Sequence, residues 1–281
     1  MNKIALITGA TSGIGYANLE LLLKEKINCI AIARSLEKAG KVKEKMRPYL
    51  EDASLHFVIG DLSNKRQTLL LIDEIKTYLD QYADGRLDIL MNIAGIVSSG
   101  LHLNEDGNEL TFATNHLSVF MLTTALIPYL EKSIDPRILV VSSLSHYRAS
   151  INFNNLQNKK MYNILKAYKR SKLYNVLFVK AFHQKYLHLP IFAIDPGLVK
   201  TEIGLKNTSR LAAWVWKLRV SKGTDAYYPA HFMVRIALDP SYVTQSGLYF
   251  KEGIAKKSNP VTYNMHVAHR LWDETMSILN K

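Results

Sequence analysis

Six short apolar runs recur along the chain, and each is continuous instead of alternating with polar residues. They occupy residues 3–9, 28–34, 55–62, 87–95, 137–144 and 190–197. Strands show this pattern when helices cover both faces of their sheet, as in a parallel sheet. Parallel strands cannot be joined by tight hairpins, so the pattern requires a crossover segment after each run.

Segments of helical period lie between the runs. Apolar side chains repeat at helical spacing in residues 16–26, 64–79, 110–130 and 168–182. Strands that alternate with helices predict right-handed β-α-β units. We therefore expect an α/β fold, a doubly wound Rossmann domain with a parallel sheet of about seven strands and helices on both faces. No repeat or linker divides the chain, so residues 1–281 are predicted to form a single domain.

Composition limits the remaining possibilities. Cys29 is the single cysteine, which excludes a disulfide framework and favours a reducing, cytoplasmic compartment. No signal peptide or apolar span of membrane length is evident. His266 and His269 lack a third ligand, so no metal is expected. The net charge of +12 fits a solvated lysine-rich surface, and it also fits phosphate-bearing ligands, an anionic membrane or nucleic acid.

Three glycines separate the first apolar run from the first helical segment. Gly9, Gly13 and Gly15 follow the spacing T-G-x-x-x-G-x-G, which begins at Thr8. Glycine at such a turn lets the backbone approach a pyrophosphate, and the following helix N-terminus supplies free N–H groups. Taken alone, the same glycines also fit a purely structural turn.

Two tyrosine–lysine pairs have the spacing that acid–base catalysis can use. Tyr162 and Lys166 are four residues apart, and so are Tyr168 and Lys172. Residues at this spacing share one face of a helix, where the lysine charge would favour tyrosinate. Spacing alone does not choose between the two pairs.

The order of several motifs along the chain resembles that of the short-chain dehydrogenase/reductase family. The motifs are the glycine spacing, "GDL" at 60–62, "NIAG" at 92–95, "NH" at 115–116, "VSS" at 141–143, a Tyr-x-x-x-Lys and "DPG" at 195–197. The resemblance covers about residues 3–250. The gap of 25 residues from Ser143 to Tyr168 (168 − 143), with "NHLSVF" and "SGLYF", resembles the retinol-dehydrogenase-like branch.

The resemblance implies a nicotinamide dinucleotide cofactor. The residues that it places around the cofactor are Gly9, Thr11, Ser12, Gly13, Ile14, Gly15, Arg34, Asp61, Leu62, Asn92, Ala94, Gly95, Tyr168, Lys172, Pro196, Gly197, Val199 and Thr201. Arg34 stands where NAD-preferring members carry an acidic residue. A guanidinium can pair with a 2′-phosphate, so we expect NADP(H) to be preferred over NAD(H). Ile93 stands where the family usually has a second Asn, which weakens that motif.

The resemblance also implies four catalytic residues, Asn115, Ser143, Tyr168 and Lys172. Family members place Ser before the lysine and an apolar helix after it, which selects Tyr168 and Lys172 over the other pair. Ser143 would hydrogen-bond the substrate carbonyl oxygen. Asn115 would kink its helix and hold a water molecule on the proton path.

The expected reaction is hydride transfer between nicotinamide and a carbonyl or alcohol substrate of apolar character. Members of this branch usually have an N-terminal membrane anchor, and we expect none here because the first strand begins by Lys3. Residues 202–225 would form a substrate lid with Trp214 and Trp216, and its basic flanks would suit peripheral membrane contact.

Family members often pair through the helices that carry Asn115 and Tyr168, which makes a homodimer or tetramer an expectation. No basic cluster with interleaved aromatic residues suggests nucleic acid. The alternative function is a catalytically silent dinucleotide-binding regulator.

Overall fold

Strand β1 (Ile4–Thr8) lies inside the sheet of the computed structural model, which describes residues 2–199 and 223–281. Its side chains alternate between two cores, with Ile4 and Leu6 in one and Ala5 and Ile7 in the other. A strand that is buried on both faces needs apolar residues at consecutive positions. This accounts for the continuous apolar run in the sequence.

The described sheet contains eight strands in the order β3-β2-β1-β4-β5-β6-β7-β8. The further strands are β2 (Asn28–Ala33), β3 (Leu55–Ile59), β4 (Ile89–Asn92), β5 (Arg137–Val141), β6 (Ile191–Asp195), β7 (Tyr249–Lys251) and β8 (Ile254–Lys256). Strands β1 to β7 are parallel, and β8 is antiparallel to β7. The predicted doubly wound sheet is confirmed, with one short antiparallel strand added. Strand order reverses between β1 and β4, and ligands bind at the carboxyl ends of strands at such a point.

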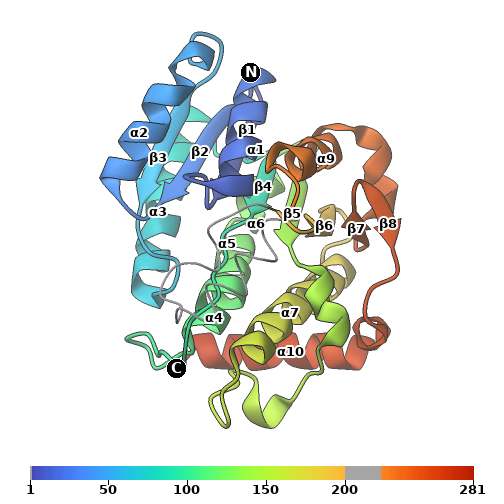
Figure 1. Ribbon diagram of the computed structural model, residues 1–281. Helices are drawn as coiled ribbons and strands as arrows, with labels where there is room; N and C mark the ends of the chain where they lie inside the picture. Colours follow the sequence, from blue (N-terminus) through green and yellow to red (C-terminus); the bar gives the residue numbers. More distant parts are fainter. Residues whose placement is uncertain (1, 200–222) are drawn as a thin grey trace.

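Helices cover both faces of this Rossmann-like domain (Figure 1). Helices α3, α5 and α7 pack on one face, and α1, α2 and α9 on the other. Their bounds are α1 (Gly13–Lys24), α2 (Leu36–Met46), α3 (Lys65–Tyr82), α5 (Ser118–Ala125), α7 (Ile164–Lys185) and α9 (Tyr227–Leu238). Short 3-10 turns are η1 (Arg47–Tyr49), η3 (Leu144–Arg148), η4 (Phe153–Asn155), η5 (Pro240–Gln245) and η6 (Pro260–Tyr263).

Helix α10 (Met265–Leu279) lies across α7 near the C-terminus of the chain (Figure 1). The ring of Trp272 lies 4.7 Å from that of Phe120 and 5.6 Å from that of Phe178, measured between centroids. Helices α5 and α7 are therefore joined by α10 through an aromatic cluster. Among the described residues, none of the helices combines the length and the apolar character needed to cross a membrane.

The helical segment expected at residues 110–130 is divided into four pieces. Helix α4 (Leu110–Phe112) leads into a π-helical turn, η2 (Ala113–Leu117), which is followed by α5 and α6 (Ile127–Leu130). A π turn accommodates one extra residue per turn and is frequent at functional sites. Asn115 lies in the middle of it, with no exposed surface.

Candidate active site

The glycine-rich turn after β1 has no room for a side chain at Gly15 and little room for one at Gly9. A Cβ atom on Gly15 would lie 2.2 Å from the carbonyl oxygen of Gly9, and one on Gly9 would lie 3.1 Å from the Cα atom of Ala94. Gly9 and Gly13 also have positive φ angles of 71° and 54°. Glycine adopts these angles without the steric cost that a Cβ atom brings.

The glycine-rich turn leads directly into the N-terminus of α1. Ser12 is the N-cap residue, but its side chain makes no capping hydrogen bond, and the first turn of α1 contains no acidic residue. The first N–H groups of a helix have no partner within the helix, and its dipole favours an anion. The turn that contains Thr11, Ser12 and Ile14 therefore fits the pyrophosphate of a dinucleotide.

The ends of β2 and β3 place the residues expected near the adenosine side. Arg34 is exposed directly after β2 and forms no ion pair with the described residues. Asp61 follows β3, where its carboxylate accepts a hydrogen bond from the backbone N–H of Ser63 at 2.9 Å. Leu62 is buried beside it. A cation rather than a carboxylate therefore follows β2.

The end of β4 is tied to the end of β1. The hydroxyl of Thr8 accepts hydrogen bonds from the backbone N–H groups of Ile93 and Ala94, at 2.8 and 2.9 Å. The side chain of Asn92 points into the core, where it donates to the hydroxyl of Thr123 at 3.0 Å. Its side chain thus joins β4 to α5.

Asn115 connects the segment after β4 to helix α7. Its Oδ1 accepts from the N–H of Ile96 at 2.7 Å, and its Nδ2 donates to the carbonyl of Ile96 and to the hydroxyl of Ser171, both at 3.0 Å. A Cβ atom on Gly95 would lie 3.3 Å from Oδ1 of Asn115 and 3.4 Å from Nζ of Lys172. Asn115, Gly95 and Lys172 therefore meet at one point.

The two serines after β5 have different partners. Ser142 is buried and donates to the backbone carbonyl of Lys172 at 2.8 Å, so its hydroxyl fastens β5 to α7. Ser143 is partly buried, and its hydroxyl lies close enough to Tyr168 to lower the pKa of the phenol. Only the second serine of the pair is brought to the tyrosine.

Burial affects Tyr168 and Lys172 in opposite directions. It raises the pKa of Tyr168 to about 12, against a lowering by the Ser143 hydroxyl, and the negative charge of Asp195 adds to the increase. Burial lowers the pKa of Lys172 to about 8. The Nζ atom of Lys172 lies 5.8 Å from the centroid of the Tyr168 ring and donates to the carbonyl of Val141 at 3.1 Å. Burial, and not the lysine charge expected from the spacing, dominates the pKa of the tyrosine.

The other tyrosine–lysine pair does not share a helix face. Tyr162 lies in the loop before α7, and its hydroxyl donates to the carboxylate of Glu109 at 3.0 Å. Lys166 is exposed in the first turn of α7. Burial, followed by the charge of Glu109, raises the pKa of Tyr162 to about 12. Within the part of the chain that the structure describes, this tyrosine bonds a carboxylate and not a lysine.

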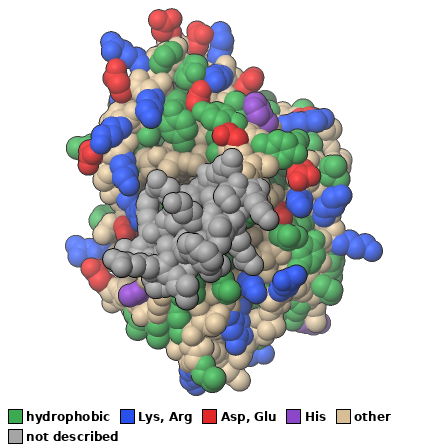
Figure 2. Space-filling model, viewed as in Figure 1, with side chains coloured by type: hydrophobic (Ala, Val, Ile, Leu, Met, Phe, Trp, Pro, Cys, Tyr) green, Lys and Arg blue, Asp and Glu red, His purple; other side chains and the backbone are tan. Residues whose placement is uncertain are grey.

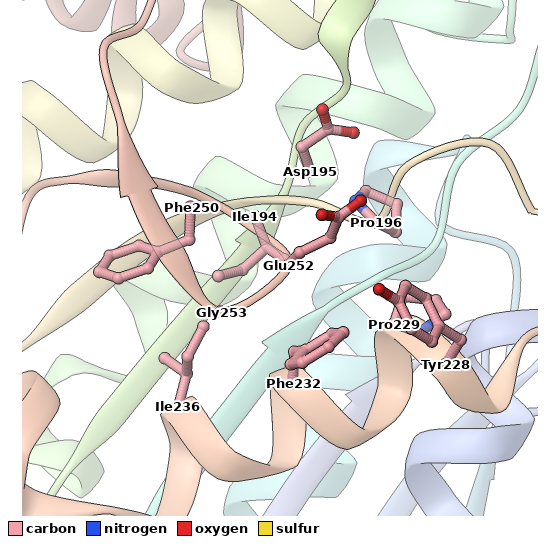
Figure 3. A pocket seen from close by; sticks show the side chains of 10 residues that line it. All are labelled: Ile194, Asp195, Pro196, Tyr228, Pro229, Phe232, Ile236, Phe250, Glu252 and Gly253. Atoms are coloured by element: carbon pink, nitrogen blue, oxygen red, sulfur yellow. The ribbon is translucent and has the colours of Figure 1, made fainter.

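The "DPG" turn begins at the end of β6. The carboxylate of Asp195 accepts from the N–H of Gly197 at 2.9 Å, and Gly197 has a φ angle of 74°. Val199 is buried and pairs with Thr224 in an isolated parallel bridge. Pro196 also lines a small pocket of largely apolar character beside α9 (Figure 3).

Three of the residues expected in the site, Thr201, Trp214 and Trp216, lie outside the described residues. The structure also adds contacts that the motifs did not reveal. Thr8 and Ser142 hold the strand ends in place, and Ser171 supports Asn115. Thr8 and Ser142 do lie inside recognised motifs, whereas the partnership of Ser171 with Asn115 spans 56 positions and leaves no sequence signal.

Known proteins match nearly the whole chain. A model of the short chain dehydrogenase family matches residues 3–211. Retinol dehydrogenase 14 of Homo sapiens is 30% identical over 289 residues, which covers 96% of this chain and 84% of the human protein. Polyprenol dehydrogenase of Homo sapiens is 27% identical over 292 residues, which covers 98% of this chain and 84% of that protein.

Solved structures share the fold at lower identity. An uncharacterised protein from Mycobacterium paratuberculosis aligns with a TM-score of 0.76 at 23% identity, covering 99% of this chain and 94% of its own. A short chain dehydrogenase from Shigella flexneri, solved in complex with NADP, aligns with a TM-score of 0.67 at 22% identity, covering 90% and 98%. The family model spans well over half of the residues, and the curated relatives cover almost all of them. The chain therefore belongs to the short-chain dehydrogenase family, in its retinol-dehydrogenase-like branch.

Proposed function

We propose that the protein is an NADP(H)-dependent oxidoreductase that interconverts an apolar aldehyde or ketone and the corresponding alcohol. The observation that carries this proposal is the convergence of Ser143, Tyr168 and Lys172. The buried Nζ atom of Lys172 lies 5.8 Å from the centroid of the Tyr168 ring, and the Ser143 hydroxyl lowers the pKa of the same tyrosine. A protein that only binds a dinucleotide has no use for a proton donor placed beside a buried lysine in this way. This argues against the alternative of a silent regulatory protein.

In the proposed reduction, Tyr168 donates its phenolic proton to the carbonyl oxygen of the substrate. The hydroxyl of Ser143 donates a hydrogen bond to the same oxygen and holds it beside the phenol. The ammonium of Lys172 stabilises the tyrosinate that forms. Asn115 fixes the turn after β4 against α7 and supports the water path expected at this position. A bound nicotinamide would supply the hydride to the carbonyl carbon.

The choice of NADP(H) rests on Arg34. This side chain is exposed after β2 and unpaired among the described residues, so its guanidinium is available to a 2′-phosphate. A carboxylate at this place would repel that phosphate. The Shigella structure in complex with NADP shows that this fold can hold the phosphorylated cofactor.

The apolar substrate class is supported by the names of two relatives, a retinol dehydrogenase and a polyprenol dehydrogenase. We further propose that residues 202–225, with Trp214 and Trp216, cover the substrate and touch a membrane surface peripherally. Figure 2 shows Lys and Arg side chains scattered over the face drawn, with Asp and Glu among them, as on a solvated surface. This pattern favours a small-molecule substrate over nucleic acid.

Location and assembly complete the proposal. The buried thiol of Cys29 suits a reducing compartment such as the cytoplasm. Helix α10 packs over α5 and α7, so a homodimer or tetramer formed through those helices would include α10 in its interface.

The test is consumption of NADPH or NADH, followed by near-ultraviolet absorbance, with a panel of aldehydes and ketones of increasing chain length. We expect turnover with NADPH that improves with the apolar length of the substrate. Tyr168→Phe is the matched control, because it removes only the phenolic oxygen and its proton. Tight NADPH binding without turnover of any carbonyl or alcohol would support the regulatory alternative instead.

A further inference from the structure

A buried histidine lies directly behind Ser143. His146 has no exposed surface, and its Nδ1 atom lies 2.7 Å from the backbone carbonyl oxygen of Ser143. Its Nε2 atom lies 3.1 Å from the backbone nitrogen of Asn259. A carbonyl can only accept and an N–H can only donate, so Nδ1 carries the proton and Nε2 carries none. The two partners together hold the ring in one neutral tautomer.

Asn259 fastens the remainder of the same segment. Its Nδ2 atom lies 3.1, 3.2 and 3.0 Å from the backbone carbonyl oxygens of His146, Tyr147 and Ala149. Asn259 is 7% exposed and lies between β8 and η6, more than 100 residues from the serine. Residues 143–149 are therefore clamped by a distant part of the chain.

The ring of His146 also connects Ser143 to the turn after β6. Its centroid lies 4.6 Å from that of Tyr249, whose hydroxyl donates to Asp195 at 2.8 Å. The other carboxylate oxygen of Asp195 accepts from the N–H of Gly197. In Figure 3 this carboxylate points away from the apolar side chain of Phe232. The segment after β5 and the segment after β6 thus share one buried network.

We propose that His146 is a positioning residue for Ser143, and that its neutral imidazole joins the Ser143 carbonyl to Asn259 and thereby keeps the serine hydroxyl on Tyr168. This inference rests on the proposed function. Ser143 stands at the junction of β5 and η3, where its side chain also accepts from the N–H of Ser145 at 3.2 Å. A small displacement at this junction would move the hydroxyl away from the reacting oxygen, and displacements of about 1 Å can cost roughly a hundredfold in rate.

The two hydrogen bonds that join His146 to Ser143 and Asn259, which we call the clamp, require a neutral ring. Protonation would place a second N–H at Nε2, opposite the N–H of Asn259, so two donors would face each other. Burial lowers the pKa of His146, against increases from the Ser143 carbonyl and from the negative charge of Asp195. The other titratable groups packed on the ring are Tyr147 and Tyr249. We therefore expect the clamp to open only at acidic pH, below the usual range of histidine.

The experiment compares His146→Leu with His146→Asn. Leucine removes both hydrogen bonds, whereas the Nδ2 of asparagine can occupy the position of Nδ1 and still donate to the Ser143 carbonyl. We expect His146→Leu to lower kcat by about tenfold or more with the KM for NADPH unchanged, and His146→Asn to restore most of the loss. The acidic limb of the kcat profile should be present in the wild type and absent in His146→Asn. His183→Asn is the matched control, because His183 is partly buried and bonds Ser246 outside the site.

A measurement on the wild-type protein separates the inference from the proposed function. Nitrogen-15 NMR of the imidazole should show the tautomer protonated at Nδ1, which is the less common form in water. A ring protonated at Nε2 would refute the clamp whether or not the protein turns over a carbonyl. Absence of turnover in the wild type would overturn the proposed function while leaving this measurement intact. The positioning role would be wrong if His146→Leu retained the wild-type kcat. It would also be wrong if His146→Asn lost as much activity and thermal stability as His146→Leu does.

Discussion

Replacing Gly15 with alanine tests whether the turn after β1 is as close as the structure shows. The added Cβ atom would lie 2.2 Å from the oxygen and 2.6 Å from the carbon of the Gly9 carbonyl group. It would also lie 3.1 Å from the backbone nitrogen of Ala10. All three atoms belong to the backbone, so no flexible side chain can move to relieve the contact.

Relief requires the turn and the start of α1 to separate by roughly 1 Å, the gap between the 2.2 Å contact and ordinary carbon–oxygen packing. Overpacking of this kind costs about 1–3 kcal/mol. A loss of 1 kcal/mol lowers the melting temperature of a large domain by about 2–4 °C. Because the same movement turns the N–H groups of α1 away from the pyrophosphate, we expect the Kd for NADPH to rise by about tenfold or more. Differential scanning fluorimetry and quenching of protein fluorescence by NADPH would measure the two effects.

Gly40→Ala is the matched control. Gly40 is exposed inside α2, and a Cβ atom on it would have no neighbour within 4 Å. Alanine favours an exposed helix interior over glycine by up to about 1 kcal/mol, so this variant should melt at a slightly higher temperature and bind NADPH as the wild type does. The reasoning is refuted if Gly15→Ala binds NADPH with unchanged affinity and melts like the wild type.

Three further predictions concern single side chains. Arg34→Asp should lower the preference for NADPH over NADH by about tenfold or more, because a charge-assisted contact contributes about 1.5–3 kcal/mol; an unchanged ratio of kcat/KM values would show that Arg34 does not select the cofactor. Tyr168→Phe should abolish turnover with cofactor binding retained, whereas Tyr162→Phe should have a mild effect, and steady-state rates in the opposite order would move the active site to the other pair. Lys172→Met should abolish turnover but raise the melting temperature at pH 7, because the fall in the lysine pKa from 10.5 to about 8 corresponds to roughly 3 kcal/mol. The lysine binds its proton more tightly in the unfolded chain than in the folded one. The gain in stability of Lys172→Met over the wild type should therefore be complete below pH 8 and shrink as the pH rises towards 10.5. A gain in stability that does not change with pH would contradict the burial of a charged lysine.

The parallel sheet could be predicted because each strand carries its own signal. The run at residues 3–9 became β1 and the run at 28–34 became β2, since burial on both faces leaves a continuous apolar pattern. Strands β7 and β8 have three residues each and lie outside the six runs. Strands this short hold too few residues to show a period. The apolar pattern does not show the break at Asn115, which the family resemblance did imply as a kink. Bonds to Ile96 and Ser171 hold the π turn, and both partners are distant in sequence.

The candidate site also contains residues that the sequence motifs predict and residues that only the structure reveals. Ser143, Tyr168 and Lys172 lie in motifs with fixed spacing, and the structure brings all three together. His146 and Asn259 lie in no such motif, because their partnership spans 113 positions and depends on the path of the chain after β8. Spacing reveals the groups that share one helix or one loop, whereas the groups that hold them in place come from elsewhere in the fold.

The protonation states of the site depend on burial, which no local spacing can give. Burial disfavours the charged form of both groups, and it therefore raises the pKa of Tyr168 and lowers that of Lys172. The negative charge of Asp195, itself held by Tyr249, moves the tyrosine further in the same direction. At neutral pH the phenol is thus protonated, while the lysine pKa of about 8 leaves most of the ammonium charged. A protonated donor beside a cation suits protonation of a developing alkoxide, which the proposed carbonyl reduction requires. Alcohol oxidation needs the tyrosinate. The rate of oxidation relative to the rate of reduction should therefore increase as the pH rises.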